Sequence, residues 1–237
     1  MSRTLRIAFI VLMLGLTALF AWLGTWQMER LGEKEALIAA VETGLHSDPV
    51  PLDATSANLA YRPVTATGSY LPTGQVLVFT NLAEPKGQFG GPGYWVMAPF
   101  ALESGGTLFV NRGFIPQDRR AELATLAPPA GEQTLSGLMR DTEPSGGFTP
   151  EPDKANAIDW VRDPQRLAAL TPGLPEPILS GFLDLPASAA GELPQGGETV
   201  IEFPNNHLGY AITWFGFAIL TPILLGFWIA RQRKGRG

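Results

Sequence analysis

A histidine and two large aromatic rings are concentrated in residues 204–214, near the C-terminal end of the chain. This segment reads Pro-Asn-Asn-His-Leu-Gly-Tyr-Ala-Ile-Thr-Trp. Its asparagines can cap a helix that begins at His207, because their side chains accept hydrogen bonds from the first free backbone N–H groups. Tyr210, Ala211 and Trp214 follow at offsets of three, four and seven, which predicts that they share the face of His207. The positive end of the helix dipole disfavours an imidazolium there, and neutral imidazole is the form that binds metals.

A second group of candidate residues follows the N-terminal apolar stretch. It consists of Trp26, Gln27 and Arg30. If both apolar stretches cross a membrane, these residues leave it on the side where His207 enters. An imidazole, several flat rings and a cation suit a planar apolar macrocycle with anionic edges, such as haem. The alternative is an aromatic belt at the membrane interface, with His207 contacting headgroups or backbone.

Other metal chemistry has little material in this chain. There is no cysteine, which excludes disulfides, covalent c-type haem attachment and thiolate metal sites. His46 and His207 are the only histidines. A zinc or copper centre built from two or three histidines is therefore not expected.

Two uncharged stretches must position these residues. They are Ile7–Trp26 and the slightly longer Leu208–Ala230, which contains Pro222. About 20 residues at roughly 1.5 Å each cross a hydrocarbon core of roughly 30 Å, and membrane helices tolerate proline. We predict transmembrane helices at residues 7–27 and 207–230. A cleaved secretory signal is the alternative for the first, but signal cores hold only about 7 to 15 apolar residues and end at a small-x-small site.

Basic residues close to the two spans predict the orientation. Arg3 and Arg6 precede the first span, and four further basic residues follow the second, namely Arg231, Arg233, Lys234 and Arg236. By the positive-inside rule, the N-terminus at 1–6 and the basic tail at 231–237 are expected in the cytoplasm. Residues 28–206 are then expected on the far side of the membrane.

The expected fold is a membrane protein in which two transmembrane helices flank one β-rich α+β extracytoplasmic domain. A helical extension over 28–45 precedes a loop at Ser47–Asn58, and short β-like runs then alternate with Gly and Pro. They predict one mostly antiparallel sheet or partial barrel. The expected strands are Tyr61–Tyr70, Gln75–Asn81, Gly93–Phe100, Thr107–Phe114, Gln133–Arg140, Pro177–Leu183 and Glu198–Phe203, with short helices at Gln117–Leu126 and Pro164–Leu170.

The charge of the middle region excludes some classes of function. It holds all 22 acidic residues and 11 of the 17 basic ones, a formal charge of −11, which argues against a nucleic-acid partner. No Gly-x-Ser-x-Gly, phosphate loop or dinucleotide fingerprint occurs, so an enzyme is not expected. Arg112 lies near the end of an expected strand, directly before Gly113, where it could pair with an anionic ligand or form a structural ion pair.

Taken together, these segments resemble the surfeit-locus-one family of cytochrome c oxidase assembly factors over nearly the whole chain. The residues that carry the resemblance are Leu23-Gly24-Thr25-Trp26-Gln27 with Arg30 and Lys34, Tyr61-Arg62-Pro63-Val64 with Gly68 and Tyr70, Gly93-Tyr94 with Pro99, Val110-Asn111-Arg112-Gly113 with Pro116, Gly137 with Arg140, and Asn205-Asn206-His207 with Tyr210, Thr213 and Trp214.

The resemblance implies a function that the residues alone only permit. It implies an assembly factor that binds haem a and aids its insertion into the largest subunit of a haem a-containing terminal oxidase. It also implies that a histidine of the second span binds the iron, which by position is His207. The remaining residues of the implied site are Trp26, Gln27, Tyr210 and Trp214 around the macrocycle, with Arg30 or Arg112 at the propionates.

The resemblance also implies partners and a location. The partners are the largest oxidase subunit, haem a synthase and the lipid bilayer. No transit peptide precedes the first span, so we expect the bacterial cytoplasmic (inner) membrane, with the main domain in the periplasm. The alternative function is a haem-free membrane chaperone or scaffold that stabilises an oxidase assembly intermediate, in which His207 is only an interfacial residue.

Overall fold

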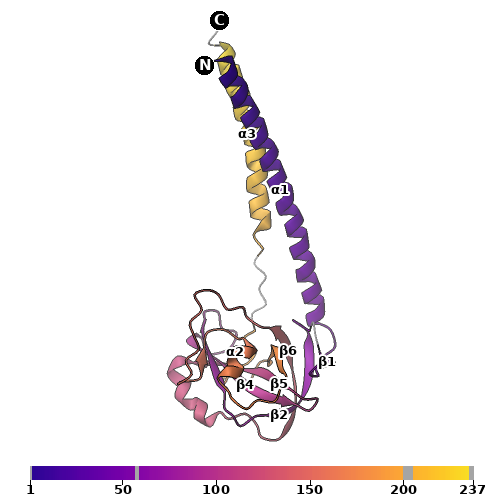
Figure 1. The fold of residues 1–237 in the computed structure, drawn as a ribbon, viewed down its shortest axis with the longest axis vertical. Coiled ribbons are helices and arrows are strands. Elements are labelled where there is room, and N and C mark those ends of the chain that lie inside the picture. Colours follow the sequence, from indigo (N-terminus) through magenta and orange to yellow (C-terminus); the bar gives the residue numbers. More distant parts are fainter. Residues whose placement is uncertain (1, 57–58, 200–204, 235–237) are drawn as a thin grey trace. The chain divides into compact units, whose positions relative to one another are not determined.

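The chain divides into two compact units, a helical unit of residues 1–40 and 202–237 and a β-rich unit of residues 41–201. The computed structural model describes residues 2–56, 59–199 and 205–234. The helical unit is formed by the two ends of the chain, and the β-rich unit by the middle, in agreement with the expected arrangement of elements (Figure 1).

The helical unit contains two long helices, α1 (Arg3–Leu45) and α3 (His207–Lys234). Both are long and apolar enough to be candidate membrane spans. The predicted helical extension is confirmed, because α1 continues without interruption to Leu45. The predicted start of the second helix at His207 is also confirmed, and α3 continues through Pro222.

Aromatic contacts show that the two helices run antiparallel. Phe9 near the start of α1 contacts Trp228 near the end of α3, with ring centroids 4.7 Å apart. Phe20, further along α1, contacts Trp214 at 5.8 Å and Phe217 at 5.5 Å. A narrow stripe is buried between the helices, formed by Gly24, Gln27, Ala211, Thr221 and Leu225.

The β-rich unit is built on one eight-stranded sheet with the order β1-β2-β6-β8-β5-β4-β3-β7. An additional pairing of β2 with β4 closes β2, β6, β8, β5 and β4 into a five-stranded ring. Three pairings are parallel, β1–β2, β3–β7 and β5–β8, and the others are antiparallel. The strands are β1 (Val50–Pro51), β2 (Pro63–Tyr70), β3 (Val76–Leu82), β4 (Gly91–Leu102), β5 (Thr107–Pro116), β6 (Glu132–Asp141), β7 (Ile158–Asp159) and β8 (Ile178–Asp184).

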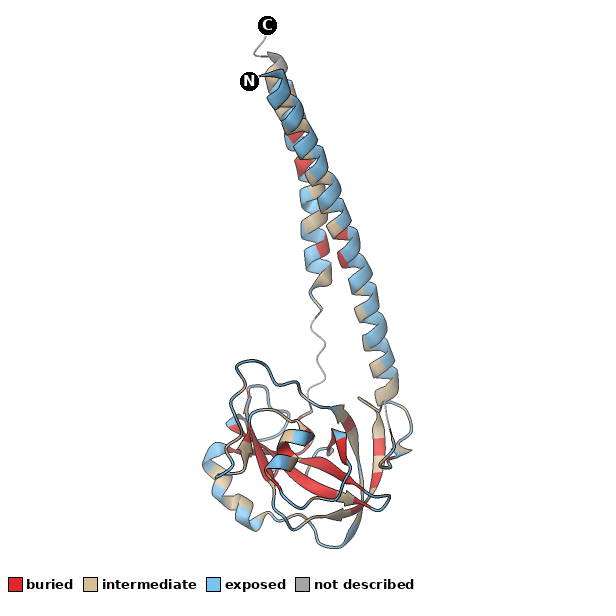
Figure 2. Cartoon of the chain, in the orientation of Figure 1, coloured by how far each residue is buried: buried red, intermediate tan, exposed pale blue. Residues whose placement is uncertain are grey.

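Side-chain alternation explains how the ring encloses a core. Along β2 the buried positions are Val64, Ala66 and Gly68, every second residue, as expected for a strand with one face inside. A Cβ atom at Gly68 would lie 2.0 Å from the carbonyl oxygen of Ala101. Glycine is therefore required where β2 approaches β4. Figure 2 shows the buried residues concentrated in these strands.

A second layer of core lies against the sheet under the short helix α2 (Pro164–Ala169). Leu167 of this helix is fully buried with Phe109, Phe114 and Phe182. Asp163 caps α2 by accepting a hydrogen bond from Gln165 N at 2.9 Å. The predicted partial barrel of mostly antiparallel strands is confirmed.

Several details differ from the sequence-based expectations. Two-residue strands at β1 and β7 were not predicted, and β1 interrupts the expected loop at Ser47–Asn58. The expected helix at Gln117–Leu126 is a 3₁₀ helix, η1 (Gln117–Thr125). Of the expected strand Glu198–Phe203, residues 200–203 lie outside the described residues. Glu198 and Thr199 are not in a strand, and the buried Glu198 carboxylate accepts the backbone N–H groups of Lys86 and Gly87.

Candidate functional site

His207 occupies the first position of α3. Its backbone N–H donates to Asn205 Oδ1 over 3.4 Å, so one of the two expected asparagine caps is present. The contact is long, and it satisfies one of the first free N–H groups of the helix. The imidazole is half-buried at this end of the helical unit.

The imidazole of His207 is held by an amide from the other helix. Its Nδ1 lies 2.8 Å from Gln27 Oε1, between residues 180 positions apart in the chain. An amide oxygen can only accept, so in this arrangement Nδ1 carries the proton and donates it. The Gln27 side chain is only 9% exposed, so the bond also satisfies a buried amide. The expected meeting of the two helix ends is confirmed by this contact.

The same tautomer leaves Nε2 of His207 with a free lone pair. Among the described residues, no hydrogen-bond partner reaches this nitrogen. Metal-binding histidines commonly donate one ring N–H to a protein oxygen and bind the metal with the other nitrogen. The His207–Gln27 pair has this arrangement within one unit of the protein.

Trp26 and Arg30 lie one residue before and three residues after Gln27 on α1. The guanidinium carbon of Arg30 lies 5.8 Å from the centroid of the Trp26 ring. Arg30 also pairs with Glu33 at 2.7 Å, and both side chains are more than half exposed. An ion pair this exposed contributes little to stability, so Arg30 can be released to another anion at small cost.

Trp214 is placed by α1 as well as by its own helix. Its ring stacks on Phe20 with an interplanar angle of 21°. Sequence reasoning missed Phe20, although it lies seven residues before Gln27, the spacing of two helical turns on one face. Phe20, Gln27, His207 and Trp214 therefore all lie where the two helices contact each other.

Tyr210 does not share the buried side of α3, contrary to expectation. It is 57% exposed, whereas the neighbouring Ala211 is only 1% exposed. Tyr210 instead lines a hollow of about 340 Å³ together with Asn205, Asn206, Gly209 and Thr213. The reason is helix rotation: α3 turns Ala211 toward the partner helix, and Tyr210, one residue or about 100° away around the helix, then lies on the flank.

Arg112 belongs to the β-rich unit, unlike the other six predicted site residues. Its Nη1 donates to Gln75 Oε1 at 2.5 Å and to the Leu126 carbonyl oxygen at 2.6 Å. No carboxylate forms an ion pair with it in the part of the chain that the structure describes, so the structural ion pair considered for Arg112 is absent there. Burial lowers the pKa of Arg112, and Tyr70 and Glu192 partly oppose that shift.

The residues of the helical unit fit a haem better than a bare metal ion. No group of three or more His, Cys, Asp or Glu side chains that could hold a metal occurs among the described residues. A haem brings four nitrogen ligands of its own and needs as few as one from the protein. His207 Nε2 could serve as that one ligand, with Trp26 and Trp214 as apolar rings and Arg30 as a cation.

The chain matches known proteins over most of its length. A profile described as the SURF1 family matches residues 14–219. A SURF1-like protein of Monosiga brevicollis is 33% identical over 90% of this chain and 83% of its own length. Surfeit locus protein 1 of Homo sapiens is 31% identical over 96% of this chain and 78% of its own. An uncharacterised SURF1-like protein of Mycobacterium bovis is 29% identical over 92% of this chain and 80% of its own.

Proposed function

Because the chain belongs to the SURF1 family, we propose that it is an assembly factor for a haem a-containing cytochrome c oxidase. In this proposal it binds haem a and aids its insertion into the largest oxidase subunit. The observation that carries the haem part is the bond between His207 Nδ1 and Gln27 Oε1, because it leaves Nε2 free for iron.

Each residue of the helical unit has a proposed task. His207 binds the iron, and Gln27 holds its ring in the tautomer that exposes Nε2. Trp26 and Trp214 cover the apolar macrocycle, and Tyr210 contacts it from the flank of α3. Arg30 exchanges Glu33 for a propionate, which an arginine can bind through two parallel hydrogen bonds. In this proposal the bound haem is passed on to the oxidase and takes part in no reaction catalysed by this chain.

We place the helical unit in the bacterial cytoplasmic membrane, with both termini in the cytoplasm and the β-rich unit in the periplasm. Two features support this placement. Both helices expose large apolar side chains to their surroundings, including Trp22, Ile219 and Phe227, which is unfavourable in water and favourable in lipid. Basic residues precede the first span and follow the second, at the ends that are placed in the cytoplasm. Haem a synthase and the largest oxidase subunit are the proposed protein partners within that membrane.

The haem proposal is tested by comparing the two histidines of the chain. The full-length protein is produced together with haem a, purified, and examined by absorption spectroscopy. His207→Ala should abolish the bound-haem spectrum or shift it strongly. His46→Ala is the matched control and should leave the spectrum unchanged, because the His46 imidazole is exposed and lies in hydrogen-bond distance of the Glu42 carbonyl oxygen of its own helix. Identical spectra for His207→Ala and the unchanged protein would remove His207 from the site.

A haem-free scaffold is the second candidate function. The exposure of Trp26, at 40%, and of Tyr210 favours it, because exposed rings at a helix end suit an interfacial belt or a contact with another membrane protein. This function predicts that His207→Ala still co-purifies with the largest oxidase subunit and that the oxidase keeps its normal haem content. A fall in oxidase haem content with intact co-purification favours the haem-handling function instead.

A further inference from the structure

Two cavities adjoin each other on the β-rich unit. The larger has a volume of about 520 Å³ and is lined mainly by apolar groups of the loop after β2, the end of η1 and residues 127–130. The smaller has a volume of about 390 Å³ and is lined by parts of β6 and of residues 185–194. Tyr70 and Pro129 line both cavities, so the two share a wall. Volumes of this size are typical of small-molecule sites.

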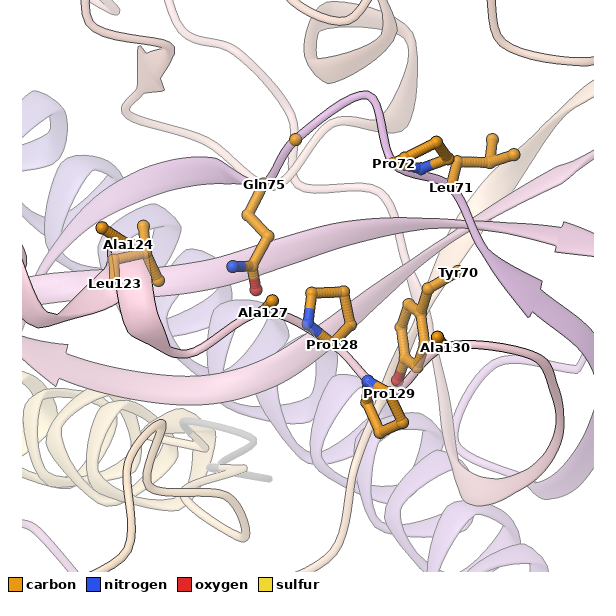
Figure 3. Close-up of a pocket in the computed structure, with 11 residues that line it drawn as sticks. Tyr70, Leu71, Pro72, Gln75, Leu123, Ala124, Ala127, Pro128, Pro129 and Ala130 are labelled. Carbon is orange, nitrogen blue, oxygen red and sulfur yellow. The ribbon is translucent and has the colours of Figure 1, made fainter.

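The larger cavity is apolar except for a few groups near this shared wall. In Figure 3 the Tyr70 ring stands beside Pro129 and Ala130, and the Gln75 amide points toward Ala127. Gln75 Oε1 accepts a hydrogen bond from Arg112, which itself lines the smaller cavity. A polar corner formed by Tyr70, Gln75 and Arg112 therefore lies where an apolar cavity meets a second cavity.

Arg112 has donors to spare in this corner. Nη1 donates to two acceptors, both of which are neutral oxygens. Nε and Nη2 have no hydrogen-bond partner among the described residues. Glu192 lines the same cavity, but it lies beyond ion-pair distance, and its carboxylate accepts the backbone N–H of Ala189. The desolvated guanidinium thus lacks the ion-pair partner that a partly buried charge normally has.

Tyr70 adds a second donor without a partner. Its hydroxyl has no hydrogen-bond partner in the described part of the chain, and its ring packs edge-on against Phe100, with centroids 5.1 Å apart. Burial raises the pKa of Tyr70 to about 12, although the nearby Arg112 opposes the shift, so the phenol keeps its proton at neutral pH. A neutral phenol and a guanidinium are both donors, and together they favour an anionic acceptor.

We propose that the paired cavities around Tyr70 and Arg112 bind a small amphipathic acid. Its anionic group bonds to the free donors of Arg112 and to the Tyr70 hydroxyl. Its apolar body occupies the larger cavity, against Leu71, Pro72 and Pro128. All residues of this site belong to the β-rich unit, and the proposal does not rest on haem binding.

The test uses equilibrium dialysis to measure binding of 4-phenylbutyrate to the full-length protein in lipid nanodiscs. This probe consists of an apolar ring and chain with one carboxylate. Empty nanodiscs supply the background. The neutral amide of the same acid should bind at least about tenfold more weakly, since a charge-assisted hydrogen bond is lost. Acetate, which has the charge but no apolar body, should show no binding at the same concentration.

Three variants test the named groups. Arg112→Gln should weaken 4-phenylbutyrate binding about tenfold to hundredfold, and Arg112→Lys should restore part of it. Ala124→Trp should abolish binding by filling the larger cavity from an exposed position on η1, which leaves Arg112 and the core unchanged. Arg120→Gln is the matched control, because Arg120 is a cation of η1 that lines neither cavity.

The results that would overturn the proposal are distinct. Equal binding of the acid and its amide would show that no anion is recognised. Unchanged binding in Ala124→Trp would place the ligand elsewhere. An equal loss in Arg120→Gln and Arg112→Gln would show that the effect is general electrostatic attraction. Circular dichroism of each variant separates loss of the site from loss of the fold.

Discussion

At the scale of single residues, the hydrogen bond between Gln27 and His207 is the most informative contact in the helical unit. An imidazole at a helix start could turn either nitrogen toward a ligand. The amide oxygen, 2.8 Å from Nδ1, selects the tautomer with the proton on Nδ1. It also fixes the orientation of the ring, so Gln27 acts as a positioning residue for His207.

Replacing this amide tests the positioning role. Gln27→Leu keeps the volume of the side chain but removes the acceptor, so the preference for the Nδ1–H tautomer should weaken. The ¹⁵N chemical shifts of His207 should report that change without any ligand, and haem affinity should fall about 10- to 100-fold. Met28→Leu, at the exposed neighbouring position, is the control. Unchanged shifts in Gln27→Leu would show that the amide does not set the tautomer.

At the scale of elements, close packing between α1 and α3 sets the position of the Gln27–His207 pair. Gly24 lies three residues before Gln27, and a Cβ atom there would come within 2.6 Å of the Phe215 ring. Only glycine therefore allows this contact between the helices without a movement of the ring. Aromatic contacts at Phe20 and Phe9 continue the same interface toward the start of α1.

A larger residue at this point should separate the helices. We expect Gly24→Leu to weaken their packing by about 1 to 3 kcal/mol, the usual cost of overpacking. Because the chain has no native cysteine, cysteines at Phe20 and Phe217 can be joined by a short bismaleimide, and the yield reports the helix pair. Gly24→Leu should lower that yield several-fold. Gly15→Leu is the control, since a Cβ atom at Gly15 meets nothing within 4 Å. Equal yields would exclude Gly24 from the interface.

At the scale of the whole molecule, a network of buried charges and hydrogen bonds links several elements of the β-rich unit. Asp184 is only 2% exposed and accepts hydrogen bonds from Asn111 at 2.8 Å and Arg140 at 3.2 Å. Arg162 lies 3.7 Å from the same carboxylate and also binds Glu143. These contacts join β5, β6 and β8 to residues 143 and 162 of the long connection between β6 and α2.

This network predicts a loss of stability in acid. Burial raises the pKa of Glu143, but its hydrogen bonds and charge attraction with Arg162 lower it more, so the net pKa lies below its usual 4.5. A depressed pKa means that the pairing stabilises the fold fully above about pH 4.5 and is lost as the pH falls through the folded value. Urea unfolding of the protein and of Glu143→Gln should differ at pH 7 and converge toward pH 3. Glu132→Gln, at an exposed strand end, should follow the unchanged protein at every pH. A constant difference for Glu143→Gln would contradict this assignment.

The amino-acid sequence alone predicts most elements of this protein and their order along the chain, although not the short strands β1 and β7. An uncharged, apolar stretch of about twenty residues indicates a long helix. Short runs of alternating apolar and polar residues bounded by Gly and Pro indicate strands. Both signals are local in the sequence. It also placed His207 at the start of a helix and Gln27 near the end of an uncharged stretch. The family resemblance followed from the same local motifs.

Which side chains contact one another follows from the tertiary structure and not from the sequence pattern. A span that is apolar on all sides carries no strong signal for its rotation, so the sequence could not show that Ala211 faces the partner helix while Tyr210 does not. Three features join residues that are far apart in the chain. They are the pairing of β2 with β4, the hydrogen bond from Arg112 to Gln75, and the contact between Gln27 and His207. Such contacts depend on packing and register, which local composition does not specify.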